Sequence, residues 1–580
     1  MWQLSTGKPQ HLPHLTAAIE NVVVAPSGSS YALTLANNSV IVLSTTELEA
    51  KTNIVGIQSR RVDLEQLPKE SKSGKAYYDI FHPVPMAVNP ANPGEVLLSV
   101  PSSQPRSRNE GLRPEPYLQT FDLANHRAKS RQALTRNNAT EPNVAPEGGR
   151  VKEPSVKLLT ASHDGEWLAT VDEWVPPRTD TGYLNEGVPE FNEEERLRRR
   201  EVYLKIWRRD EENAQWKLEA RIDAPHLFEE VCGNGRVIDL VADPSAAGFA
   251  TVGEDHVVRI WRPKTRLRDG VVVRGAEEEG LVTWSLDRSI ELSDKLDGFE
   301  GSQQSLPPRT SRLAFSADGS VLAAAISWAS DSDLGVTHLI DTDSAIIRRS
   351  ITEVDVTALS GLAFIGQRLV VVADSITVWD MVLDQLVYCV PISTPGIDRF
   401  ERIPLVRLAV DEANDTFAVA LPQFEKNESP TSRLKKASSK LSIFNASQNE
   451  ALWTGTSSSI TLALVARKGE SGYVVLDSTS CIKTISPTTG PLQLPTPPPE
   501  EKAELQRTIY AEEDEDEKHS GPTTAITVSD DLTQDLGDDE HVFSAQSLQE
   551  VLDNGAVPPP PQGLFNAVLA LIGRPTKVAA

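Results

Sequence analysis

A single pattern of apolar and polar positions recurs along most of the chain. A short apolar strand leads into a turn rich in Pro, Asp, Ser or Gly, a second strand of small residues follows, and a third strand ends in an aromatic residue. The clearest copy is VIDLVADPSAAGFATVGEDHVVRIWRP at 237–263. Short strands that are separated by turn residues are typical of all-β proteins.

Eight copies of this pattern can be aligned, and several are followed by a further short strand such as EARID at 219–223. The copies occupy residues 19–44, 86–123, 156–209, 237–263, 312–343, 361–381, 405–446 and 461–486. A repeated four-stranded unit predicts a β-propeller, because radial closure protects the strand edges and a sandwich would not repeat one strand order. We therefore expect an all-β fold, a WD40-type β-propeller of seven to eight blades at 61–490.

Long polar insertions interrupt several copies. They cover residues 62–79, 101–116, 137–153, 177–200, 264–280 and 423–440. Their Pro, Ser, Asn and charged content predicts surface loops or disordered segments. EEERLRRRE at 193–201 has blocks of opposite charge at helical spacing, which predict an exposed, self-paired helix rather than a nuclear import signal.

The first 60 residues fit the repeat only in part. WQLSTGK at 2–8 reads like the end of one strand and the start of the next, yet it stands at the start of the chain. Residues 17–56 are either the first blade of the ring, whose last blade would then borrow the strand HLPHL at 11–15, or an end piece of an upstream propeller, which leaves seven blades at 80–487. We expect residues 1–60, a partial blade or such a remnant, to pack less completely than the later repeats and to expose apolar surface.

The repeats end near Pro495. Residues 500–554 carry 17 acidic and 3 basic side chains, which is −14 of the formal net charge of −25. Low hydrophobicity with high net charge predicts disorder. FSAQSLQEVLD at 543–553 places apolar residues on one helical face, and GLFNAVLALIG at 563–573 is a second apolar stretch. We expect residues 491–580 to form an acidic, largely disordered tail with docking helices at these two places.

Cysteine spacing and the length of apolar runs indicate the cellular setting. Cys232, Cys389 and Cys481 form no CxxC pair, which argues against a disulfide framework or zinc ribbon and favours a reducing compartment. The apolar stretch at 563–573 is shorter than the roughly 20 residues of a membrane-spanning helix, and the first residues lack a signal-peptide layout. We expect a soluble intracellular protein with no membrane partner.

Two repeats contain the local sequence of a WD repeat. GEDHVVRIW places Asp255 in a tight turn and Trp261 at the end of the next strand, and ADSITVWD places Asp374 and Trp379 similarly, one residue closer together. A turn carboxylate can contact a ligand, but such turns recur wherever a blade must be built, which favours a structural role. We expect these four to be structural blade residues.

No motif of enzymatic chemistry stands out. His163 and His256 lie in turns without a nucleophile at motif spacing, and a histidine that bonds the backbone explains each of them better. SGK at 73–75 lacks the upstream glycine of a phosphate-binding loop, and no HExxH, GxSxG or GxGxxG string occurs. We expect no enzyme activity, no catalytic, metal or cofactor site and no small-molecule substrate.

Two basic segments raise the question of RNA binding. One runs from Arg106 to Arg136, and the other is the insertion at 423–440. Positive loops on an otherwise acidic ring can contact a phosphate backbone, although solvated loops explain these segments more simply. The candidate RNA contacts are Arg106, Arg108, Arg113, Lys129, Arg131, Lys435 and Lys436.

Taken together, these segments resemble a known family. The segments that show this resemblance are WQLSTGK followed by HLPHL, the run IENVVVAPSGSSYALTLANNSVIVLS, the insertion before REVYLKIW, and GFATVGEDHVVRIW. They are similar in layout to the WD repeat-containing protein seventy-five family, the fungal U-three small nucleolar RNA-associated WD-repeat subunit of the UtpA, or t-UTP, subcomplex of the small-subunit processome. The resemblance covers residues 1–490 and is most specific at 1–60 and 200–263. Because that family carries tandem propellers, it implies that this chain lacks the N-terminal one.

The resemblance implies a non-catalytic scaffold in nucleolar small-ribosomal-subunit biogenesis, which supports pre-rRNA transcription and early processing. The implied partners are other WD-repeat subunits of the UtpA complex and pre-rRNA or small nucleolar RNA, in the nucleus and nucleolus. Two alternatives stay open. One is a generic WD-repeat adaptor of another nuclear or cytoplasmic complex, for instance in ubiquitin ligation or trafficking. The other is a propeller enzyme, which needs clustered His, Asp or Glu in the central channel, and the repeats supply none in register.

Overall fold

The computed structural model describes residues 2–3, 8–9, 15, 17–58, 78–101, 114–136, 153–176, 189–210, 215–228, 232–268, 271–274, 280–292, 308–328, 335–425 and 434–488. The chain divides into two compact units, Met1–Lys502 and Ala503–Ala580. All described residues belong to the first unit. The tail and the two docking helices expected at 543–553 and 563–573 therefore lie outside the described residues.

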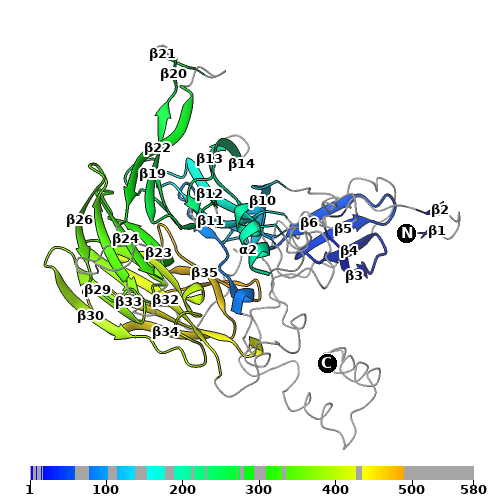
Figure 1. The fold of residues 1–580 in the computed structure, drawn as a ribbon. Coiled ribbons are helices and arrows are strands. Elements are labelled where there is room, and N and C mark those ends of the chain that lie inside the picture. The colour runs from blue at the N-terminus through cyan, green and yellow to red at the C-terminus, as the bar shows by residue number, and fades with distance from the viewer. Residues whose placement is uncertain are drawn as a thin grey trace, which may run out of the picture. The chain divides into compact units, whose positions relative to one another are not determined.

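Strands dominate the described residues, where eight sheets hold three or four antiparallel strands each, and each sheet is named here by its first strand (Figure 1). The first three sheets are β3 (Ile19–Val24), β4 (Ser30–Leu35), β5 (Ser39–Ser44) and β6 (Ala50–Val55); β7 (Met86–Val88), β8 (Glu95–Val100), β9 (Tyr117–Asp122) and β10 (Arg127–Ala133); and β11 (Ser155–Ala161), β12 (Trp167–Trp174), β13 (Glu201–Asp210) and β14 (Gln215–Asp223). The next two are β17 (Val237–Ala242), β18 (Phe249–Gly253), β19 (Val257–Thr265) and β22 (Val282–Glu291); and β23 (Pro308–Phe315), β24 (Val321–Trp328), β25 (Gly335–Asp341) and β26 (Ile346–Ile351).

The last three sheets follow in the same order along the chain. They are β27 (Gly361–Ile365), β28 (Arg368–Val372), β29 (Ser375–Asp380) and β30 (Gln385–Pro391); β31 (Arg407–Asp411), β32 (Thr416–Gln423), β33 (Ser438–Asn445) and β34 (Ala451–Ser457); and β35 (Thr461–Ala466), β36 (Tyr473–Asp477) and β37 (Ile482–Ile485). Two-stranded ribbons pair β1 (Trp2–Gln3) with β2 (Lys8–Pro9), β15 (Leu227–Phe228) with β16 (Gly233–Asn234), and β20 (Leu267–Arg268) with β21 (Val271–Val272). The helical segments whose bounds the structure describes are α2 (Pro189–Arg198) and the 3-10 turns η2 (Tyr78–Phe81), η5 (Ile403–Leu405) and η6 (Glu412–Asn414).

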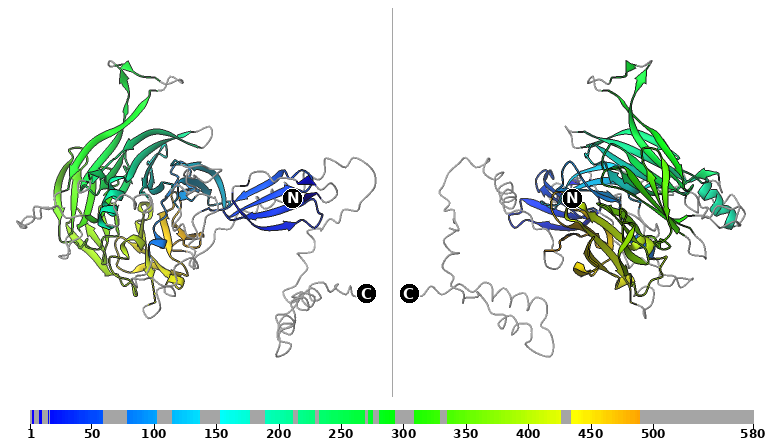
Figure 2. Two further views of the ribbon diagram at one scale, coloured as in Figure 1. Left: turned by 45° about the vertical axis from the view of Figure 1, so that its right-hand side comes forward. Right: turned by 90° about the vertical axis from the view of Figure 1, so that its left-hand side faces the viewer.

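The first strands of seven sheets contact one another in a closed circuit. β7 contacts β11, β17 contacts both β11 and β23, and the contacts continue through β27 and β31 to β35, which contacts β7 again. In Figure 2 the colours run from blue through cyan, green and yellow to orange around this circuit. The arrangement is propeller-like, in agreement with the expected all-β fold.

Packing between neighbouring sheets explains the small residues of the second strands. Both faces of β24 are buried, and Ala323, Ala324 and Ala325 are fully buried, because a sheet lies against each face and close-packed interiors leave little room for large side chains. The fourth strand β26 instead alternates exposed and partly buried residues. The sequence pattern therefore reflects position within each sheet.

One β-bulge recurs between the third and fourth strands of every four-stranded sheet in the described part. It immediately precedes an apolar residue near the end of the third strand, and the pairs formed by that residue are Leu43–Ala50, Phe121–Ala128, Trp207–Leu218, Trp261–Leu286, Ile340–Ile347, Trp379–Leu386 and Phe444–Ala451. A bulge increases the local twist of a strand pair. The third-strand position at which most repeats carry an aromatic residue is thus a fixed backbone position of the repeat.

The circuit closes at the carbonyl of Leu462 in β35. This oxygen accepts hydrogen bonds from the backbone N–H of Val84, which precedes β7, at 3.2 Å, and from Nε of Arg407 in β31 at 2.9 Å. One continuous apolar cluster contains residues of the β7 sheet, such as Val96 and Val100, and residues of the β35 sheet, such as Val474 and Leu476. The first and last sheets of the circuit therefore share one core.

The β3 sheet lies outside this circuit. All six residues of β3 are exposed, and the exposed fractions of Ile19, Val22, Val23 and Val24 lie between 40% and 58%. The expectation that residues 1–60 expose apolar surface is therefore confirmed. Most of the HLPHL segment at 11–15 lies outside the described residues.

Two insertions contain regular structure. The helix expected at 193–201 is confirmed as α2, where Arg198 pairs with Glu194 at 3.2 Å and Arg199 with Glu195 at 2.8 Å. The expectation of a loop or disordered segment at 264–280 is wrong for its described residues. β19 and β22 extend beyond their sheet, and the ribbon β20–β21 projects from them (Figure 1). The β-branched run Val271–Val273 favours this extended backbone.

Loss of the guanidinium at the closure should destabilise the protein. Arg407→Met retains an unbranched side chain but removes the donors to the carbonyls of Leu462 at 2.9 Å and Pro404 at 2.7 Å. We expect the free energy of unfolding, measured by urea denaturation, to fall by about 1–3 kcal/mol, as for buried hydrogen bonds to a charged group. Lys435→Met at an exposed position is the matched control, and equal losses for the two variants would contradict a special role of Arg407.

Candidate functional site

A chain of hydrogen bonds links four side chains in and beside the β17 sheet. Nε1–H of Trp261 in β19 donates to Oγ1 of Thr251 in β18 at 3.0 Å. The same oxygen lies 2.9 Å from Nε2 of His226, whose Nδ1 lies 2.8 Å from Oδ1 of Asp255 in the β18–β19 turn. His226 and Thr251 are fully buried, so this network holds the segment before β15 against the sheet.

The hydrogen bond of the indole has a fixed direction, whereas those of the imidazole do not. Since the indole can only donate, Oγ1 of Thr251 accepts from Trp261. Nδ1 of His226 lies near two groups of opposite character, the carboxylate of Asp255 at 2.8 Å and Nη1 of Arg259 at 2.5 Å. A protonated Nδ1 donates to Asp255 and an unprotonated Nδ1 accepts from Arg259, so the heavy-atom positions do not set the tautomer.

Burial and neighbouring charges act on the pKa values of both His226 and Asp255. Burial lowers the pKa of His226, although the hydrogen bond and charge of Asp255 act in the opposite direction. Burial raises the pKa of Asp255, but the hydrogen bonds and charges of His226 and Arg259 outweigh it and lower the pKa to about 2. Nη1 of Arg259 lies 2.6 Å from Oδ2 of Asp255.

A glycine makes room for the buried imidazole. A Cβ atom added at Gly253 would lie 2.2 Å from Cγ of His226, far inside van der Waals contact. The sequence interpretation missed His226, because it weighed only the turn histidines His163 and His256. Two features of the sequence could have indicated it. His226 lies 29 residues before the WD-repeat aspartate Asp255, and Gly253 lies two residues before the same aspartate.

The second WD-like pair has different partners. Nε1 of Trp379 donates to Oδ1 of Asp384 at 3.1 Å, whereas Oδ1 of Asp374 accepts from Nη2 of Arg402 at 2.5 Å. Among the described residues no hydrogen-bond chain of the kind seen at Trp261 joins Asp374 to Trp379. A nearer parallel to Trp261 is Trp207, which donates to Oγ1 of Thr170 at 2.9 Å.

Two candidate RNA contacts bond to groups of their own sheet, the β7 sheet, and the side chain of Lys129 is itself 46% exposed. Nζ of Lys129 lies 2.9 Å from both Glu95 and Asp122, and the hydrogen bond that it donates to Glu95 is the main reason that the pKa of Lys129 is raised. Arg131 donates to the carbonyl of Pro101 at 2.9 Å and stacks on Tyr117, with 4.1 Å between Cζ and the ring centroid. These charges are committed to intramolecular contacts.

The other five candidates are either exposed or lie outside the described residues. Arg106, Arg108 and Arg113 lie outside the described residues. Lys435 is exposed, and Lys436 pairs with Glu425 at 3.3 Å. The structure therefore does not gather the seven candidates into one described surface.

Within the ranges that the structure describes, no group of three or more His, Cys, Asp or Glu side chains is placed to hold a metal ion. No helix of this part of the chain is long and apolar enough to cross a membrane.

The indole donor of Trp261 should contribute measurably to stability. Trp261→Phe keeps a buried ring but removes the hydrogen bond to Thr251, and we expect a loss of about 1 kcal/mol in the free energy of unfolding. Trp379→Phe is the matched control, because its bond to Asp384 is exposed to solvent and should contribute less. A loss at Trp379 as large as that at Trp261 would contradict the role of the buried network.

The histidine should make stability depend on pH. Because the folded-state pKa of His226 is lowered, the unfolded chain binds a proton near pH 6.5 that the folded chain does not, and stability falls as the pH drops below this value. His226→Gln cannot be protonated. We expect the stability advantage of the wild type over this variant to shrink between pH 7 and pH 5, measured by urea denaturation. An advantage that stays constant would exclude this linkage.

Comparison with known proteins gives a distant relationship. No family model matches the chain. Among solved structures, a chain of the crystal structure of the mitotic checkpoint complex is similar with a TM-score of 0.39 and 11% sequence identity, over 72% of this chain and 96% of that one. Over 265 residues the chain is 26% identical to U3 small nucleolar RNA-associated protein 17 of Schizosaccharomyces pombe, a match that covers 45% of this chain and 29% of that protein, less than a third of its length. In sequence, the chain is thus a distant relative of a U3 small nucleolar RNA-associated protein.

Proposed function

We propose that the chain is a non-catalytic scaffold subunit in nucleolar small-ribosomal-subunit biogenesis, which supports pre-rRNA transcription and early processing. The observation that carries this proposal is the similarity to a U3 small nucleolar RNA-associated protein over 265 residues. The absence of an assembled set of catalytic groups in the described part is compatible with it. Its place of action would be the nucleus, within the nucleolus.

The proposal includes a domain organisation. The circuit of seven sheets supports a WD40-type β-propeller of seven blades within 61–490. The β3 sheet has the same bulge position as the sheets of the circuit but an exposed first strand, which supports residues 1–60 as part of a further propeller. Residues 491–580 would be the acidic tail with its docking helices.

The proposed partners are other WD-repeat subunits of the UtpA, or t-UTP, complex, together with pre-rRNA or small nucleolar RNA. Propellers present broad rims on which several proteins can assemble at once. Direct RNA contact would involve the exposed Lys435 and the arginines at 106, 108 and 113. Lys129 and Arg131 are poorer candidates, because their charges are used inside the β7 sheet.

Affinity isolation of the tagged chain from nuclear extract tests this function. We expect enrichment of U3 small nucleolar RNA and of other WD-repeat processome subunits, and nucleolar staining of the full-length chain. The combined substitutions R106S, R108S and R113S should lower ultraviolet crosslinking to RNA without changing the melting temperature. Lys129→Met should instead lower the melting temperature, because it leaves Glu95 and Asp122 without their cation.

Isolation of a folded chain without U3 RNA and without processome subunits would refute the proposal. Exclusion of the full-length protein from the nucleus would favour a WD-repeat adaptor of another complex. Loss of RNA crosslinking in the arginine variant with retained protein partners would separate RNA contact from scaffolding.

A further inference from the structure

A repeated turn joins the third and fourth strands of several sheets. After the bulge position, a side-chain oxygen accepts the backbone N–H groups two and three residues further on. Asp122 does so for Ala124 and Asn125, Asp341 for Asp343 and Ser344, and Asp380 for Val382 and Leu383, while Asn445 accepts from Ser447. Asp and Asn are the usual residues of such turns, so the same hydrogen-bonded turn occurs in these four sheets.

One of the four turns has an aliphatic tip. At the β29–β30 turn, Val382 and Leu383 are 72% and 64% exposed, and Leu386 at the start of β30 is 51% exposed. The corresponding tips of the other three turns are small or polar. The turn geometry therefore does not require aliphatic residues, and these three side chains form what we name the apolar knob.

Hydrogen bonds and an ion pair brace the turn that carries the knob. Oδ1 of Asp384 accepts from Nε1 of Trp379 at 3.1 Å and from Nη1 of Arg349 at 2.8 Å. Nε2 of Gln367 donates to Oδ2 of Asp380 at 2.9 Å. Contact groups that are already ordered lose little conformational entropy on binding, and a contiguous exposed apolar patch is typical of an interaction site.

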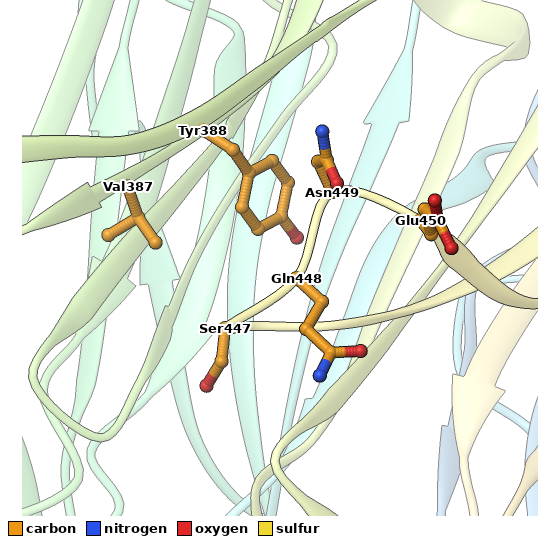
Figure 3. A pocket seen from close by; sticks show the side chains of 6 residues that line it. All are labelled: Val387, Tyr388, Ser447, Gln448, Asn449 and Glu450. Atoms are coloured by element: carbon orange, nitrogen blue, oxygen red, sulfur yellow. The ribbon is translucent and has the colours of Figure 1, made fainter.

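A pocket adjoins the knob along β30. Val387 and Tyr388 form one wall, and the opposite wall is the β33–β34 turn, Ser447–Glu450 (Figure 3). The hydroxyl of Tyr388 donates to the carbonyl of Asn445 at 2.9 Å and ties the two walls together. The pocket is lined mainly by polar groups, and Glu450 places a carboxylate at its edge.

The surroundings of the knob and pocket are acidic. Residues 341–353, 380–386 and 447–452, together with Arg368 and Asp415, carry seven carboxylates and three guanidiniums. Arg348 pairs with Asp341 and Arg349 with Asp384, each at 2.8 Å. Arg368 pairs with Asp415 at 3.4 Å and donates to Oγ of Ser447 in the pocket wall at 2.9 Å. The uncompensated charge is negative, and an apolar centre with a charged rim is the usual composition of a protein interface.

We propose that the apolar knob and the adjoining pocket dock a basic, amphipathic segment of a partner protein. Aliphatic side chains of that segment would cover Val382, Leu383 and Leu386. A Lys or Arg side chain would enter the pocket beside Glu450, and further cations would face the acidic rim. This assignment does not depend on the ribosome-biogenesis proposal, since it rests only on this surface.

Fluorescence anisotropy with the full-length chain tests the proposal. The probe is a labelled amphipathic helical peptide of Leu and Lys, and the comparison peptides replace every Leu by Ser or every Lys by Glu. The Ser–Lys peptide has the same charge and reports attraction to the acidic tail alone. We expect V382S together with L383N to weaken binding of the Leu–Lys peptide about tenfold or more, and Glu450→Gln to weaken it less, with binding falling as salt rises.

The substitutions are designed to leave the fold intact. Polar tips are tolerated at the same turn elsewhere, as in Asp343 and Ser344, and the bonds to Asp380 use backbone N–H groups. Leu218→Ser, at an exposed leucine of β14 that is also paired across a bulge, is the matched control and should leave binding unchanged. An unchanged melting temperature for each variant excludes unfolding.

Three results would overturn the proposal. The first is unchanged Leu–Lys binding by the folded knob variant. The second is equal binding of the Leu–Glu peptide, which would remove the charge argument. The third is a wild-type dimer in sedimentation velocity that the knob variant converts to a monomer, which would make a second copy of this chain the occupant.

Discussion

The contact between the two ends of the circuit is the constraint on which the other sheets depend. A row of twisted sheets, each packed on its neighbours, leaves two open faces unless its first and last members meet. Here the meeting point is a single carbonyl, that of Leu462, which accepts from Val84 and from Arg407, beside an apolar cluster that both sheets share. With this contact in place, every sheet of the circuit has a neighbour on both faces, which is why its second strands are uniformly buried.

Within the circuit the repeats share a backbone but differ in their polar contacts. The bulge position is constant, whereas the groups around it range from the buried network of His226, Thr251 and Trp261 to the solvent-facing bond between Trp379 and Asp384. A buried polar network must be fully satisfied to be stabilising, so it occurs where a histidine from the preceding segment reaches the sheet.

Local pattern predicted the strands well and the polar contacts poorly. Alternation and small residues predict the elements at 237–263, because both reflect local geometry. The partners of Lys129 could not be inferred, since Glu95 lies 34 residues away in sequence and meets it only through strand pairing. His226 was missed for the same reason. The ribbon at 264–280 was hidden because charged residues flank the short run Val271–Val273 on both sides, and exposure at Val382 cannot be read from a turn sequence at all.

The exposed first strand of the β3 sheet has a consequence for the protein in isolation. β3 is the edge strand of its sheet, and its valines present aliphatic surface on both faces. A strand with unpaired backbone groups, high β-propensity and one charge in six residues is the kind of edge that recruits identical strands into intermolecular sheets. Without a covering partner, this segment would favour ordered self-association that grows with concentration, and its burial in an assembly would then protect the chain from aggregation.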